Sequence, residues 1–188
     1  MSDQPSTTNT LRQEHRVIER VLRVLRGHVD RFERGGIFAA DDLRDCVKFF
    51  RLFADACHHG KEEDLLFPVL EQHGMSHDSG PIAVMLYEHR MGRQFVKKMA
   101  DELDAHARGE ANAQLRFATA AKEYVNLLVH HIYKEDHVLF VMSERAIPDE
   151  AEKKLCGKFC TADCGKFEGH TREELEKLAD ELESRAEV

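Results

Sequence analysis

Two similar stretches of the sequence carry the residues that could do chemistry. They read HHGKEEDLLFP at positions 58–68 and HHIYKEDHVLF at positions 130–140. Aligned without a gap, they place His59 on His131 and Glu63 on Glu135. In each copy a histidine precedes a glutamate by four residues, so on an α-helix the imidazole and the carboxylate share one face. Two such helices side by side would offer two nitrogens and two carboxylates, which is a ligand set for a pair of divalent metal ions.

Four amphipathic segments each place a histidine on the apolar side of an expected helix. These helices run from about Thr10 to Gly35-Gly36, from Asp41 or Asp42 to Pro68, from about Pro81 to Arg108, and from about Ala111 to Arg145. Their apolar residues recur at spacings of three and four. The first and third segments contribute His15 and His89. One histidine on such a stripe is usually an ordinary core residue. Four of them with two glutamates favour a metal site, because a buried unpaired carboxylate is costly.

The element pattern predicts an all-α fold. Four long helices with short joints form an up-down-up-down four-helix bundle, here with a C-terminal helical extension. We expect a disordered leader over residues 1–9, the bundle over residues 10–147, and a cysteine-containing helical tail over residues 148–188. Within the tail, Glu173–Arg185 is expected to form a short, highly charged helix.

Composition and charge disfavour several classes of protein. The chain has 27 basic and 35 acidic residues, interspersed, for a net charge of −8, which disfavours nucleic-acid binding. No apolar run approaches the roughly 20 residues of a membrane span, and the polar start MSDQPSTTNT does not resemble a signal peptide. The five cysteines are an odd number. A disulfide scaffold is therefore not expected, and the expected location is a reducing cytoplasm.

The order of histidines and glutamates resembles the hemerythrin-like (HHE cation-binding) family. The stretches that carry the resemblance are LRQEHRVIERVL, HHGKEEDLLFPVL, EHRMGRQF and HHIYKEDHVLF, within about residues 10–145. The resemblance implies a four-helix bundle with a non-haem di-iron centre. An oxo or hydroxo group could bridge the two iron ions. By position, it implies the metal ligands His15, His59, Glu63, His89, His131 and Glu135, with the two glutamates bridging. Iron rests on the resemblance, since such ligands also accept manganese or zinc.

One departure from the family pattern bears on the reaction. Oxygen-carrying hemerythrins have a second histidine one turn from the third-helix ligand, but Met85 and Arg93 stand at those positions here. We therefore expect four histidine ligands and more open metal positions, which favour reaction at the metal over reversible oxygen storage. On an α-helix, His58 and His130 point about 100° away from their neighbours, so we expect supporting or surface positions for both. Asp136 competes with Glu135 as the bridging carboxylate.

Two functional hypotheses follow from the resemblance. The first is a di-iron protein that binds or reacts with O2, NO or hydrogen peroxide. The alternative is a non-enzymatic oxygen or redox sensor, or an iron-handling module, that signals through the tail. The choice between enzyme and sensor, and the oligomeric state, remain open at this point.

The tail carries its own candidate site. It contains Cys156, Cys160 and Cys164 at spacings of four, followed by His170. Three thiols and an imidazole could hold zinc. A redox-active or simply packed group of thiols is favoured instead, because the spacing is not that of a zinc knuckle and two glycines interrupt the segment.

Overall fold

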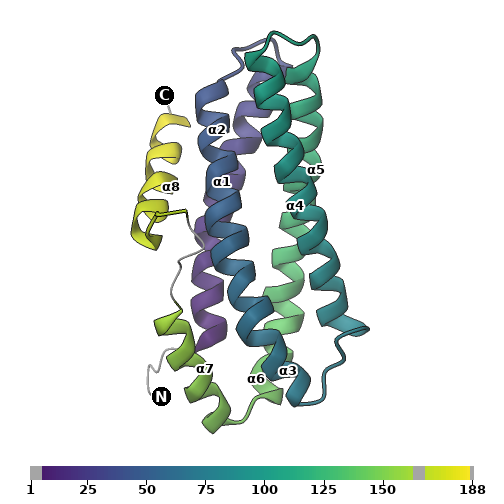
Figure 1. Ribbon diagram of the computed structural model, residues 1–188, viewed down its shortest axis with the longest axis vertical. Helices are drawn as coiled ribbons and strands as arrows, with labels where there is room; N and C mark the ends of the chain where they lie inside the picture. The colour runs from purple at the N-terminus through teal and green to yellow at the C-terminus, as the bar shows by residue number, and fades with distance from the viewer. Residues whose placement is uncertain (1–5, 163–167, 187–188) are drawn as a thin grey trace.

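The computed structural model describes residues 6–162 and 168–186 of the chain. The helices form columns that run side by side, and shorter helices lie along one edge (Figure 1). The columns are α1 (Thr7–Glu33); α2 (Ala40–Phe49) with η1 (Phe50–His59), η2 (Glu62–Leu66) and α3 (Phe67–Gln72); α4 (Gly80–Ala107); and α5 (Ala113–Lys134) with η3 (Glu135–Leu139) and α6 (Phe140–Ala146). The edge helices are α7 (Asp149–Thr161) and α8 (Arg172–Ala186). The prediction of an all-α bundle with a C-terminal helical extension is confirmed.

The first helix begins earlier than its apolar pattern indicates. The side chain of Ser6 accepts a hydrogen bond from the backbone N–H of Asn9, which caps the helix. Thr7 and Thr8 are buried and belong to α1, although the sequence analysis placed them in a disordered leader. Residues 1–5 of that expected leader lie outside the described residues, as do the last two residues of the tail.

The second and fourth columns depart from α-helical geometry where they carry the paired histidines and glutamates. The segments η1, η2 and η3 are π-helical. A π-helix closes its backbone hydrogen bonds from i to i+5 instead of i to i+4, so each turn holds more residues. Successive side chains in these segments are therefore turned by less than the roughly 100° of an α-helix.

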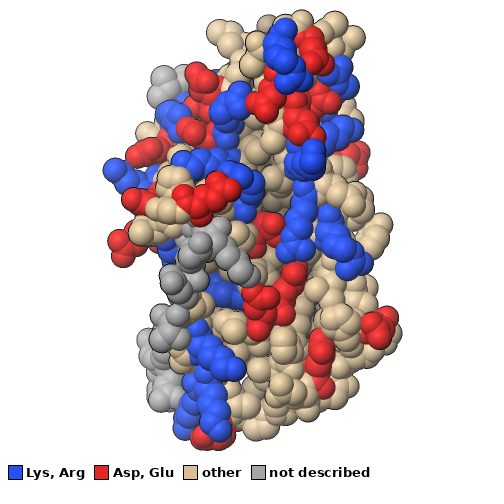
Figure 2. Space-filling model, in the orientation of Figure 1, with Lys and Arg blue, Asp and Glu red and all other residues tan. Residues whose placement is uncertain are grey.

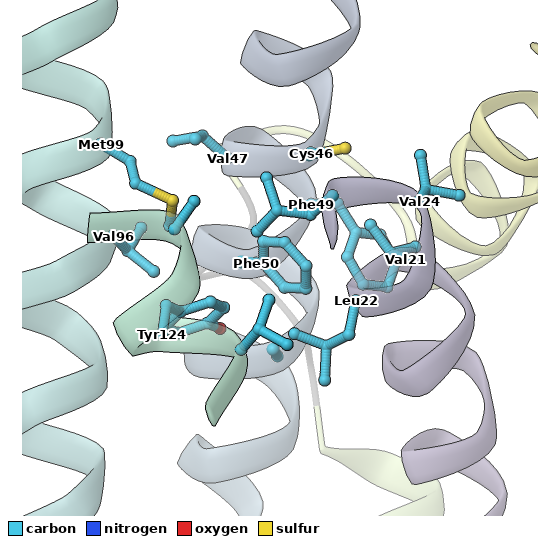
Figure 3. Close-up of a cluster of buried hydrophobic side chains, with 14 of the residues drawn as sticks. Val21, Leu22, Val24, Cys46, Val47, Phe49, Phe50, Val96, Met99 and Tyr124 are labelled. Carbon is cyan, nitrogen blue, oxygen red and sulfur yellow. The ribbon is translucent and has the colours of Figure 1, made fainter. Parts of the chain in front are cut away.

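Two apolar clusters fill the bundle. The larger one contains Phe49, Phe50 and Tyr124, which pack against α1 and α4 (Figure 3). The smaller one contains Phe67 and Phe140 near the other end of the columns. Full burial of each large apolar side chain contributes about 1.5–3 kcal/mol. Along each column, the buried histidines and glutamates lie in sequence between members of these two clusters, so apolar packing holds them from both sides.

The C-terminal helix α8 matches the charged helix expected at Glu173–Arg185 and lies against α1 and α2 (Figure 1). Its residues Leu175, Ala179 and Leu182 are buried in the larger apolar cluster. On the face shown in Figure 2, basic and acidic side chains mingle around this helix. None of the helices in the described ranges is long and apolar enough to cross a membrane.

The cysteine segment is described only in part. Helix α7 continues through Gly157, where an interruption was expected, and carries Cys156, whose Sγ lies 3.6 Å from Oε1 of Glu152. The side chain of Cys160 and the whole of Cys164 lie outside the described part of the chain. The zinc and thiol hypotheses for the tail therefore remain predictions.

Candidate metal centre

The described residues contain two groups of buried side chains that could each hold a metal ion. One consists of His59, Glu62, His89 and His131, and the other of His15, His58, Glu62 and Glu135. Within each group, the possible ligand atoms all lie within 4.8 Å of one another. Because Glu62 belongs to both groups, the two form one centre with two positions.

The two glutamates that face the centre reach from one group to the other. Glu62 has one carboxylate oxygen 3.7 Å from Nε2 of His58 and the other 3.4 Å from Nε2 of His89. Glu135 has Oε2 3.1 Å from Nε2 of His15 and Oε1 3.2 Å from Nε2 of His131. Each carboxylate can therefore serve two cations at once.

The inward-facing atoms of the centre support cation binding. Within the described residues, the buried side-chain atoms without a hydrogen-bond partner include Nε2 of His58, His59, His89 and His131, both carboxylate oxygens of Glu62 and Oε1 of Glu135. A buried polar atom left unpaired costs about 1–3 kcal/mol, and so many at one point call for a shared partner. Imidazole nitrogens with carboxylate oxygens are the ligand types of iron, zinc and manganese. The residues present thus fit a pair of divalent cations.

Four of the imidazoles are oriented by an outer carboxylate. Nδ1 lies 3.0 Å from an acceptor oxygen in the pairs His58–Glu14 and His131–Glu88, and 2.7 Å in the pairs His15–Asp136 and His89–Glu63. An Nδ1–H that donates to a carboxylate fixes the tautomer and turns Nε2 toward the centre. Such outer partners typically change metal affinity by about 10- to 100-fold.

These contacts repeat with approximate two-fold symmetry. Glu14 accepts hydrogen bonds from His58 and Lys61, and Glu88 accepts them from His131 and Lys134. The matching pattern in sequence is His-x2-Lys-Glu-acid-x2-Leu-Phe, at positions 58–67 and 131–140. Shifting the internal alignment by one residue would have revealed it, because that shift also pairs the lysines and the Leu-Phe steps.

The structure therefore places some expected ligands differently. Glu63 lies outside both groups and accepts hydrogen bonds from His89 and Arg93, each at 2.7 Å, while Glu62 faces the centre. His58 also faces the centre, although the α-helical spacing predicts a position outside it. His58 and Glu62 are four residues apart, as His131 and Glu135 are, so the inward face of the second column lies one residue earlier than the gapless alignment indicates. The other five expected residues, His15, His59, His89, His131 and Glu135, lie in the two groups.

Five histidines consequently gather where four were expected. His59 is the additional one, since the two-fold pattern pairs His58, and not His59, with His131. His130 is exposed, and its Nδ1 donates to the carbonyl of Asn126. Asp136 serves His15 from outside, which leaves Glu135 facing the centre.

The buried acids hold positive charge at the centre. Burial lowers the pKa of His15, but hydrogen bonds to Asp136 and Glu135 outweigh it and raise the pKa to about 9. Burial likewise opposes charge on His131, yet the charge of Glu135 and its hydrogen bond raise the pKa of that imidazole. Protons or cations must therefore balance the carboxylates, and cations that bind here displace protons.

Comparison with protein families agrees with this chemistry. The model of the hemerythrin HHE cation-binding domain matches residues 6–143. The chain belongs to this family. The match ends before α7 and α8, so both tail helices lie outside the family's domain.

Individual relatives match only part of their own length. Uncharacterized proteins from Mycobacterium tuberculosis and Mycobacterium bovis are 29% identical over 147 residues, covering 76% of this chain and 57% of each relative. The iron-sulfur cluster repair protein YtfE from Yersinia pestis is 35% identical over 85 residues, covering 44% of this chain and 38% of the relative. The chain thus spans about half the length of the curated relatives it matches. No solved structure matches it.

A pocket of about 410 Å³ leads from the surface to the three-histidine group of this hemerythrin-like domain. It lies between the second column and α4, with His59, Gly92 and Tyr124 in its lining. Basic side chains stand on both sides of this region in Figure 2. Beside His59, Oδ1 of Asp55 lies 3.4 Å from Nδ1 and accepts a 2.7 Å hydrogen bond from Arg93. A small molecule could thus approach one end of the centre.

Proposed function

We propose that this hemerythrin-like domain holds two iron ions at the buried centre and binds or reacts with O2, NO or hydrogen peroxide there. The observation that carries the proposal is the convergence of unpaired imidazole and carboxylate atoms on one point, with Glu62 shared by both groups. The relative named iron-sulfur cluster repair protein supports iron as the metal.

The proposed ligand set differs between the two positions. His59, His89 and His131 would hold one ion, and His15 and His58 the other, with Glu62 and Glu135 shared by both. A ferrous pair bound in this way would supply electrons to a small oxidant. The expectation against reversible oxygen binding rested on a missing fifth histidine, and His59 occupies that role in the proposed set. Oxygen binding therefore stands beside reaction with NO or peroxide.

The chain's own residues would control access and surroundings. The outer acids hold the Nδ1–H groups and keep the imidazoles directed inward. Phe140 stacks on His15 at 5.4 Å and Phe67 stacks on His89 at 6.0 Å, measured between ring centroids. These rings exclude water from the end of the centre opposite the pocket. The ligand would then enter along the pocket that reaches His59.

Metal analysis with optical spectroscopy tests the proposal. Protein purified without added metal should contain about two irons per chain, with near-ultraviolet and visible bands that change when NO or hydrogen peroxide is added. Repeated consumption of peroxide or NO would indicate an enzyme. A single spectral change without turnover would indicate a sensor or carrier. Zinc in place of iron, with no iron uptake after anaerobic reconstitution, would contradict the proposal.

A further inference from the structure

The two-fold symmetry of the centre is broken at one outer carboxylate. Glu14 is fully buried and contacts three donor side chains, namely His58 at 3.0 Å, Lys61, and Arg172 at 3.0 Å. Its counterpart Glu88 has two such partners among the described residues, His131 and Lys134. The additional cation at Glu14 comes from α8, which lies outside the family's domain.

Arg172 is held in place by its own helix. The backbone N–H of Thr171 donates to Glu174 and the backbone N–H of Glu174 donates to Thr171 Oγ1, which together form a capping box at the start of α8. Glu176, one turn further on, accepts a 2.7 Å hydrogen bond from Nε of Arg172. These contacts leave Nη1 directed at Glu14.

The position of Arg172 does not help the helix that carries it. A cation in the first turn opposes the helix dipole, which favours acidic residues there. A residue that is unfavourable for its own helix often has a separate role in the structure. Here the arginine reaches past its own helix to a buried acid that orients His58.

The docking of α8 on the bundle fixes this contact. Arg20 of α1 pairs with Asp180 at 2.5 Å and with Glu183 at 2.8 Å. On the side of the helix that faces α2, Arg185 pairs with Asp42 at 2.8 Å and with Asp45 at 2.9 Å. The apolar face of α8 is buried between these two groups of ion pairs. The C-terminal helix is thereby packed as part of the bundle that surrounds the centre.

We propose that α8 weakens electron donation to one of the two metal positions, with Arg172 as a positioning residue that acts on His58 through Glu14. This inference rests on the proposed function for its consequence at the metal. The positive charge of Arg172 partly neutralises the carboxylate of Glu14. Glu14 is then a weaker hydrogen-bond acceptor for the Nδ1–H of His58. His58 is then a weaker electron donor than His131, whose acid Glu88 has no such third partner among the described residues. The ion held by His15 and His58 is accordingly the more easily reduced of the two.

The Arg172→Met variant separates charge from geometry. Glu14 keeps its contacts with His58 and Lys61 in this variant, so the ligands should stay in place. We expect a more negative midpoint potential in the iron-loaded full-length chain, by about tenfold in the reduction equilibrium, or about 59 mV for a one-electron couple. Arg172→Lys should give an intermediate value because it returns a positive charge.

The Arg185→Met variant is the matched control. It removes a cation of α8 far along the helix from Glu14. The pairs of Arg20 with Asp180 and Glu183 and the buried apolar face still dock α8, so the potential should stay unchanged. Equal potentials in Arg172→Met and Arg185→Met would overturn the inference.

A second readout does not depend on iron. With Zn²⁺ added to the full-length chain, ¹⁵N-labelled histidine spectra should show a shifted Nδ1–H resonance for His58 in Arg172→Met and none for His131. An unchanged His58 resonance would overturn the link through Glu14. If the wild-type chain takes up no iron, the proposed function fails by itself. The inference then requires Arg172→Met to bind Zn²⁺ about tenfold more tightly than Arg185→Met, and equal affinities would overturn it.

Discussion

Oε2 of Glu62 lies 3.4 Å from Nε2 of His89, although the two residues belong to different helices and the neighbouring Glu63 holds the other ring nitrogen of the same imidazole at 2.7 Å. The carboxylates of two successive residues thus contact the two ring nitrogens of one histidine. Only Glu62 faces the centre, and Glu63 acts from outside it. Substitutions of the two glutamates should therefore have different effects on metal binding.

Replacing Glu62 should empty the centre more than replacing Glu63. Glu62→Ala removes a carboxylate shared by both groups, so bound metal should fall by at least half. Glu63→Gln removes an outer partner and should lower affinity by about 10- to 100-fold while keeping full occupancy at saturating metal. Metal titration followed by elemental analysis measures both effects. If Glu62→Ala binds the full amount of metal and Glu63→Gln binds none, Glu63 is the ligand, as the sequence spacing predicts.

His59 should behave as a ligand and His130 as a surface residue. His59→Asn removes one of three imidazoles in its group, so metal affinity should fall by more than the roughly 10- to 100-fold typical of an outer partner. His130→Asn changes an exposed side chain that bonds only its own helix, so affinity should stay at the wild-type value. Competition titration with a chromophoric chelator compares the two. Matching affinities in both variants would exclude His59 from the ligand set.

Filling the pocket should slow ligand access without disturbing the centre. A Cβ atom at Gly92 would meet Tyr124 at 3.7 Å, which is ordinary van der Waals contact. Gly92→Leu should therefore fold, with up to about 1 kcal/mol of added helix propensity, and metal content should be unchanged. Stopped-flow mixing with NO or peroxide should show a severalfold lower rate.

Gly27→Leu provides the control for the pocket experiment. Gly27 lies inside α1, and a Cβ atom there has open space around it. The residue lies outside the pocket that reaches His59. Its variant should react at the wild-type rate. An equal rate in Gly92→Leu would show that the ligand takes another path.

Protonation of His28 should weaken the fold in mild acid. Burial lowers the pKa of His28 below its usual 6.5, and the charge of Asp42, 3.8 Å away, only partly offsets the burial. Below pH 6.5 the unfolded chain therefore binds a proton that the folded chain does not, and stability decreases as pH falls. One group contributes at most about 1.36 kcal/mol per pH unit. Urea unfolding of wild type and His28→Asn between pH 5 and 8 should show the wild-type advantage shrinking below pH 6.5. An advantage that grows in acid would mean that Asp42 holds the protonated imidazole in the fold.

Much of this protein is determined by the local periodicity of its sequence. Apolar residues at spacings of three and four predicted the four columns, because that spacing follows from α-helix geometry. The same spacing placed His15 and His89 on buried faces, where both are found. The pair His131 and Glu135 also faces the centre as expected, since the two residues are one turn apart across the end of α5.

Tertiary structure decided which members of the two adjacent pairs face inward. His58 and His59 both turn toward the centre, because a π-helix turns successive residues by less than an α-helix does. Glu62, four residues after His58, faces the centre, and Glu63 lies outside it. Which of two neighbouring residues faces inward depends on partners from other helices, such as Glu14 for His58. The contact of Arg172 with Glu14 joins residues 158 positions apart in the chain. Only the docking of α8 creates that contact, because no spacing along one helix encodes the packing of another helix against it.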